Sequence, residues 1–182
     1  HYTFNVDMFW YDNIVARRQN SDDTTLQTLP AIQFDASRSQ IRNSGIYYTL
    51  DSEFRSFYRQ DTTASKVNGQ RTDIYPKFYY PMKLGRSFHF EPYIGLRETI
   101  WHTNDFTDSD GNDEDIRTRE MYDIGATLET KLLKIFNPDL SFANKMKHEI
   151  IPKLDWNFTP YIDQSEFPSF DSIDRISEEN LL

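Results

Sequence analysis

The chain has 182 residues and a mass of 21.7 kDa, a length typical of one domain or two small ones. Acidic residues outnumber basic residues by 29 to 20, and the formal charge of −9 argues against a nucleic-acid-binding protein. No stretch reaches the ~18 consecutive apolar residues of a transmembrane helix. The absence of cysteine excludes disulfides within the chain and thiolate metal sites, and an aromatic content of 15% argues against disorder.

Apolar and polar residues alternate with a period of two through most of the chain, with the apolar residues at even-numbered positions. In the first segment Tyr2, Phe4 and Val6 alternate with Thr3 and Asn5, the pattern of a strand with one apolar and one polar face. A short segment, a long one and four more follow in the same phase, and no helical period competes with them. The seven predicted strands are residues 2–10, 32–37, 46–59, 73–84, 88–97, 122–132 and 149–159.

The connections between these strands alternate in length. Outer-membrane barrels have long external loops and short periplasmic turns, so the alternation predicts an all-β, antiparallel transmembrane barrel segment. By this assignment the external segments are residues 12–28, 60–71, 103–119 and those beyond Tyr161, and the periplasmic links are 38–44, 85–87 and 135–145.

The alternation alone also allows two other protein classes. A soluble β-sandwich or sheet shows the same period, and charged residues within one strand, as in residues 51–55, suit a solvated face as well as a water-filled lumen. A small outer-membrane diffusion channel of roughly eight strands would have a similar length. Pro76, Pro92 and Pro152 fall in phase with the apolar faces, and we interpret them as sites of a bulge or strand bend.

Candidate catalytic and metal-binding patterns are weak. Residues 105–115 are rich in aspartate, but an EF-hand alignment on Gly111 puts Phe106 and Arg117 at ligand positions, so we predict a solvated acidic loop. The four histidines lack zinc-site spacing. Asp171 and Asp174 could form an acid and base pair, although no orienting partner is evident nearby. We therefore expect no enzyme activity, no cofactor and no bound metal.

Several stretches resemble the barrel region of LptD, the lipopolysaccharide-assembly protein of the Gram-negative outer membrane. Their order and spacing agree over nearly the whole chain, and the final stretches are the most specific. The stretches that carry the resemblance are residues 29–34, 69–77, 148–153, 159–164 and 168–175.

The resemblance implies a very large outer-membrane barrel that inserts lipopolysaccharide into the outer leaflet without covalent chemistry. It further implies a lipoprotein plug of the LptE type and a periplasmic jelly-roll domain that receives lipopolysaccharide from an LptA-type bridge. We expect residues 1–182 to be part of the barrel and the jelly roll to lie outside this chain, which begins without an initiator methionine or signal segment and reads as a piece of a longer protein. The implied partners are thus lipopolysaccharide, outer-membrane lipid and those two proteins.

Two groups of site residues follow from the barrel assignment and the resemblance. Odd-numbered strand positions are expected to face the lumen and the lipopolysaccharide path, and a loop matching the family motif is expected to fold into or over the lumen. The lumen positions are Asp51, Glu53, Arg55, Lys77, Glu91, Arg97, Glu129, Lys153 and Asp155, and the loop residues are Asp163, Gln164, Pro168, Phe170 and Asp171.

Overall fold

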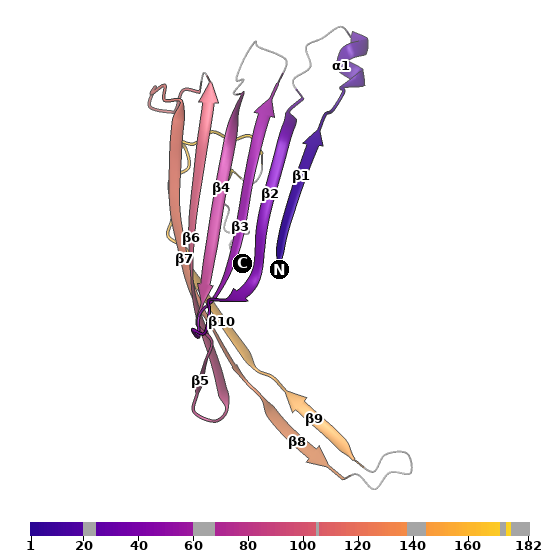
Figure 1. Cartoon of the computed structure of the whole chain (residues 1–182), viewed down its shortest axis with the longest axis vertical. Coiled ribbons are helices and arrows are strands. Elements are labelled where there is room, and N and C mark those ends of the chain that lie inside the picture. The colour runs from indigo at the N-terminus through magenta and orange to yellow at the C-terminus, as the bar shows by residue number, and fades with distance from the viewer. Residues whose placement is uncertain (20–24, 60–67, 105, 138–144, 172–173, 176–182) are drawn as a thin grey trace.

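The fold is that of a computed structural model, in which residues 1–19, 25–59, 68–104, 106–137, 145–171 and 174–175 are described. These residues form strands and one short helix (Figure 1). The elements are β1 (Tyr2–Phe9), α1 (Ile14–Gln19), β2 (Gln27–Gln40), β3 (Tyr47–Tyr58), β4 (Asn68–Tyr79), β5 (Met82–Leu84), β6 (Phe88–Asn104), β7 (Ile116–Thr130), β8 (Leu132–Phe136), β9 (Met146–Ile150) and β10 (Lys153–Phe158).

One antiparallel sheet dominates the structure. Strands β1, β2, β3, β4, β6, β7 and β10 lie side by side in that order, and β5 pairs with the start of β6 (Figure 1). Strands β8 and β9 form a separate two-stranded sheet that projects from one end (Figure 1). The prediction of an all-β, antiparallel fold is confirmed.

The strand boundaries differ from the predicted ones in several places. The second strand, predicted as residues 32–37, is the 14-residue β2. Its pairing with β3 shifts register between Thr28 and Ala31 and again between Ala36 and Ser39. Each bulge shifts the alternation of the two faces by one residue, so the residues of the apolar face have even numbers only between the two bulges.

Other predicted segments are divided. The predicted strand 73–84 comprises most of β4 and all of β5, and the strand predicted over 149–159 is interrupted at residues 151–152. The predicted loop 12–28 contains α1, where the Asn13 side chain accepts a hydrogen bond from the Ala16 backbone N–H. The helix has six residues, and no helix in the described part of the chain is long and apolar enough to cross a bilayer.

The register keeps odd-numbered residues opposite odd-numbered residues between the two bulges of β2 and throughout the pairing from β3 to β10. At the ends of β2 the phase is exchanged, so that Ser39 pairs with Tyr48. Asp35 pairs with Asp51, Asp51 with Tyr75, and Tyr93 with Gly125. A slip of one residue would exchange the two faces of a strand, so the shared phase places odd-numbered side chains on one face and even-numbered side chains on the other. We call these the odd face and the even face.

The even face carries an exposed apolar band. On β6 the band runs through the even-numbered residues from Phe88 to Leu96, of which Ile94 is 42% exposed. The stretch from residue 88 to residue 96 is nine residues long, which matches the ~9–11 residues with which a tilted strand crosses a hydrocarbon core. Beyond the band, toward the long loops, the even positions become mostly polar, with Glu98 and His102 on β6 and Glu120 on β7.

Aromatic rings on the odd face lie across glycine positions. A Cβ on Gly125 would meet the Tyr93 ring and, at 2.6 Å, the Trp156 carbonyl oxygen. Glycine at this position therefore leaves room for the Tyr93 ring beside the neighbouring strand.

The three in-phase prolines have different local effects. Pro152 lies in the gap between β9 and β10, and Lys131 lies in the gap between β7 and β8. The two gaps are adjacent, because the Thr130 backbone N–H donates to the Pro152 carbonyl oxygen. At these gaps the β8–β9 hairpin leans away from the main sheet (Figure 1). The pairing of β4 with β6 skips Tyr75 and Pro76 without a register change, and Pro92 pairs regularly with Ala126. The strand is therefore interrupted at Pro152, and the pairing with β7 shows no bulge at Pro92.

Candidate functional site

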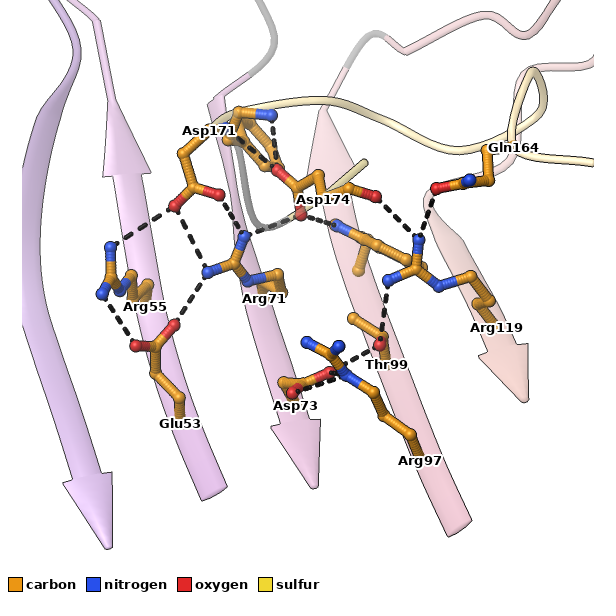
Figure 2. A network of polar contacts seen from close by, with 12 residues as sticks. Glu53, Arg55, Arg71, Asp73, Arg97, Thr99, Arg119, Gln164, Asp171 and Asp174 are labelled. Carbon is orange, nitrogen blue, oxygen red and sulfur yellow. Dashed lines mark hydrogen bonds and ion pairs between the residues drawn. The ribbon is translucent and has the colours of Figure 1, made fainter. Parts of the chain in front are cut away.

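The C-terminal segment, residues 159–171 and 174–175, returns across the odd face of the sheet. It lies over the loop-proximal parts of β3, β4, β6 and β7 (Figures 1 and 2). The strand residues beneath it lie beyond the apolar band, since Arg71 pairs with Trp101, five residues past Leu96. The site therefore lies at a level of the sheet where the opposite face is also mainly polar.

Arg71 on β4 is the centre of this site. Its Nη1 atom donates to Asp171 Oδ1 and to Asp174 Oδ1, each at 2.7 Å, and its Nη2 atom donates to Glu53 Oε1 at 2.7 Å (Figure 2). The Arg71 side chain is 1% exposed and the Asp174 side chain 0%. A planar guanidinium with several donors is suited to holding three carboxylates at once.

The Asp174 carboxylate accepts hydrogen bonds from neutral donors as well as from Arg71. The Trp101 indole Nε1–H donates to its Oδ1 atom at 3.1 Å. The backbone N–H groups of Phe170 and Asp171 donate to Oδ2 at 2.6 and 3.0 Å. The carboxylate therefore closes a turn within the C-terminal segment and fixes that turn to β4 and β6.

Arg119 on β7 supplies a second attachment. Its Nη1 atom donates to the backbone carbonyl of Asp174 at 2.7 Å and to Gln164 Oε1 at 3.4 Å (Figure 2). Its guanidinium also lies over the Trp101 ring, 4.9 Å from the ring centroid. Four arginines and four carboxylates meet in and beside this network, so their formal charges cancel: Arg55, Arg71, Arg97, Arg119, Glu53, Asp73, Asp171 and Asp174.

Aromatic packing accompanies the ion pairs. Phe170 stacks on Phe57 of β3 with ring centroids 4.5 Å apart, and Phe167 stacks on Trp101 at 5.3 Å. A Cβ on Gly69 would come within 3.0 Å of the Phe170 ring, so the absence of a side chain there leaves room for the ring. Phe57 and Trp101 of the sheet and Phe170 of the segment form a buried apolar cluster between the two.

The residues of the predicted motif loop divide between anchors and turns. Phe170, Asp171 and the buried Pro168 lie against the sheet, and Gln164 reaches Arg119. Asp163 accepts a hydrogen bond from the Ser165 backbone N–H at 3.0 Å, which holds the pKa of its carboxyl below the ordinary value. The loop is thus held both by strand side chains and by its own turns.

The predicted odd-face residues do not form one site. Glu53 and Arg55 belong to the Arg71 network, with Arg55 Nη1 3.3 Å from Asp171 Oδ2, and Arg97 pairs with Asp73 at 2.9 Å. Nearer the short turns, Arg38 of β2 forms a two-bond pair with Glu91. The remaining positions lie along the same face. Asp51 pairs with Asp35 and Tyr75 of the neighbouring strands, Lys77 Nζ lies 3.9 Å from Asp123, and Lys153 Nζ lies 3.0 Å from Asp155. Glu129, Lys153 and Glu91 line a hollow of about 490 Å³.

Three central residues of the network lie outside the predicted strands. Arg71 and Arg119 fall in predicted loops, and Trp101 lies past the predicted end of its strand, whereas the structure places them in β4, β7 and β6. All three share the odd-numbered phase, which would have identified them had the strands been extended. The expectation that Asp171 and Asp174 lack an orienting partner is wrong, because Arg71 binds both carboxylates.

The acidic loop between β6 and β7 is internally bonded. Asp108 accepts hydrogen bonds from the backbone N–H groups of Asn112 and Asp110 and from Arg117 Nη1 at 3.0 Å. These donors, the Asn112 backbone N–H first, lower the pKa of Asp108. Among the described residues no cluster of three or more potential metal ligands occurs.

Comparison with known proteins gives the family. The chain matches the LptD family, described as LPS transport system D, over residues 1–182. It is also similar to the LPS-assembly protein LptD of Methylococcus capsulatus, with 23% identity over 153 residues. That similarity covers 84% of this chain and 14% of the relative, so the chain spans a small part of the relative's length. Because the family match extends over its whole length, the chain belongs to the LptD family.

Proposed function

We propose that this chain is part of the outer-membrane translocon that inserts lipopolysaccharide into the outer leaflet of a Gram-negative outer membrane. The observation that carries the proposal is a sheet with one exposed apolar face and one charged face in a chain of the LptD family. In this role the protein provides a path and performs no covalent chemistry.

The two faces support a wall between lipid and water. A lipid-facing surface needs apolar side chains over one hydrocarbon thickness, which the even face offers on β6 from Phe88 to Leu96. The odd face carries charged side chains at the same level, such as Lys77 and Asp123, as a water-filled lumen requires. The proposed lipopolysaccharide path runs along Asp51, Glu53, Arg55, Lys77, Glu91, Arg97, Glu129, Lys153 and Asp155.

The C-terminal segment would then cover the external part of this path. Arg71 and Arg119 present cationic groups of the kind that bind phosphate and carboxylate, and here they hold Asp171 and the backbone of Asp174. We place the contact with sugar or with an LptE-type plug on this family-motif loop, through the exposed Asp163 and the half-buried Gln164. The buried Pro168 and Phe170 and the Arg71-bound Asp171 would hold the loop on the sheet. Delivery from an LptA-type bridge would use a periplasmic domain of the full-length protein.

The assignment of the two faces can be tested by placing a charge on each. Ile94→Arg puts a cation on the exposed apolar face and should cost ~2–4 kcal/mol if the residue lies at the bilayer midplane. Thr49→Arg adds the same charge to the odd face of β3 beside Lys77 and should leave assembly nearly unchanged. The readout is the amount of folded full-length protein in the outer membrane. Equal assembly defects in the two variants would reject the face assignment.

The function itself is tested by depleting the full-length protein in its own cells. Newly made lipopolysaccharide should accumulate inside the cell and stop reaching the surface, and re-expression of the wild-type protein should restore delivery. Continued surface delivery after depletion would reject the translocon role. The next experiment in that case is ion conductance of the reconstituted protein, since a diffusion channel would also present a charged inner face.

A further inference from the structure

The hairpin of β8 and β9 continues past the end of the apolar band. Phe88 is the first residue of β6, and it pairs with Thr130 at the end of β7. Strand β8 begins two residues later and pairs with β9 from Leu132 opposite Ile150 to Phe136 opposite Met146. Five further residues extend the strand by ~17 Å. The hairpin therefore lies outside the part of the sheet needed to cross the hydrocarbon core.

The hairpin nevertheless exposes apolar side chains at both ends of its even face, with the Lys134–His148 pair between them, and Leu133 and Ile135 on its odd face. Leu132, Phe136, Met146 and Ile150 are all exposed, and they continue the phase of the even face of β7 and β10. A two-stranded hairpin has little stability by itself in water. Its exposed apolar face therefore requires a surface to cover it.

The charge of the hairpin indicates the chemistry of that surface. The chain as a whole has a net charge of −9, but residues 131–137 and 145–151 contain four lysines and one acidic residue, Glu149. Glu149 contacts Lys131 and Lys147. The Lys134 ammonium lies on the even face, 4.9 Å from the centroid of the Phe136 ring. Long basic side chains above apolar ones suit a boundary between anionic groups and hydrocarbon.

We propose that the β8–β9 hairpin binds the anionic headgroup surface of the phospholipid leaflet at that end of the sheet. The four even-face apolar side chains would enter the outer part of the acyl-chain region, and lysines would contact the lipid phosphates. The inference rests on the membrane-spanning sheet of the proposed function. It adds a lipid contact outside the lipopolysaccharide path.

The test uses the full-length protein with a photoreactive benzophenone side chain in place of Phe136. The protein is reconstituted in phosphatidylcholine vesicles with or without phosphatidylglycerol, irradiated, and analysed for lipid adducts. Adducts should be several-fold more abundant with phosphatidylglycerol, and raised salt should reduce them. Lys134→Gln should remove most of this increase. Lys83→Gln, which deletes the same charge on β5 at the same end of the sheet, should leave it unchanged.

Each other outcome overturns the inference. Equal adducts in both kinds of vesicle would reject recognition of anionic lipid. Crosslinks to the protein itself, or to a second protein, would show that a protein surface covers the hairpin. If the full-length protein fails to span vesicles at all, the proposed function fails too, whereas a spanning protein without lipid adducts rejects the hairpin contact alone.

Discussion

Replacing Arg71 with alanine should release the C-terminal segment from the sheet. The substitution leaves Asp174, whose side chain is 0% exposed, without its cationic partner, and it also removes a donor to Asp171 and Glu53. Removing one partner of a buried ion pair costs about 3–5 kcal/mol of stability. The strand pairing of β4 does not depend on this side chain, so we expect the loss to appear as local opening of the segment.

Proteolysis measures this opening. Glu166 lies in the segment and is exposed, so a glutamate-specific protease can act on the full-length protein once the segment detaches. A loss of ~3 kcal/mol raises the population of the open form, and hence the cleavage rate, by roughly a hundredfold. Arg17→Ala is the control, because Arg17 pairs with Asp12 in an exposed ion pair and its removal should change cleavage little. Unchanged cleavage in Arg71→Ala would mean that the arginine does not hold the segment.

The sequence predicted the sheet well because one physical constraint repeats along it. Within the apolar band the strands carry mostly apolar residues on the even face and mostly polar residues and tyrosines on the odd face, and between the bulges of β2 the register keeps that phase from β1 to β10. A period of two is the strongest signal available to a single sequence. It identified the positions of Glu53, Arg97 and Lys153 on one face without knowledge of any contact.

The same signal failed where the strands leave the apolar band. On β6 the even positions Glu98 and His102 are polar like loop residues, although the strand continues to Asn104. Where the even face is no longer regularly apolar, the alternation by which a strand is recognised is lost. Arg71, Trp101 and Arg119 lie in these outer parts, which explains why the centre of the site was missed although its C-terminal half was identified.

Contacts between residues far apart in the chain are a second feature that the sequence pattern does not predict. Arg71 and Asp174 are 103 residues apart, and nothing in the local pattern of either predicts that they meet. The resemblance to the family did single out Phe170 and Asp171, but it did not specify what they contact. The register of four strands and the return of the chain over the odd face together create the site.

Phe170→Ala should detach the same segment through loss of packing. The ring is 8% exposed and stacks on Phe57 at 4.5 Å, and truncating a buried phenylalanine to alanine costs about 3–5 kcal/mol. The backbone N–H groups of Phe170 and Asp171 both donate to Asp174, so their hydrogen exchange in the full-length protein reports the opening directly. Exchange at these two amides should become roughly a hundredfold faster or more.

A second aromatic residue in the segment provides the control. Tyr161 is 89% exposed, so Tyr161→Ala should leave the exchange of these amides unchanged. The double variant with Arg71→Ala separates two explanations, since the Arg71 guanidinium also lies over the Phe57 ring at 5.4 Å. If ion pairs and aromatic packing close one cooperative unit, the second substitution should add much less than its single effect, because the segment is already open. Fully additive effects would instead mean that the carboxylates and the phenylalanine anchor the segment independently.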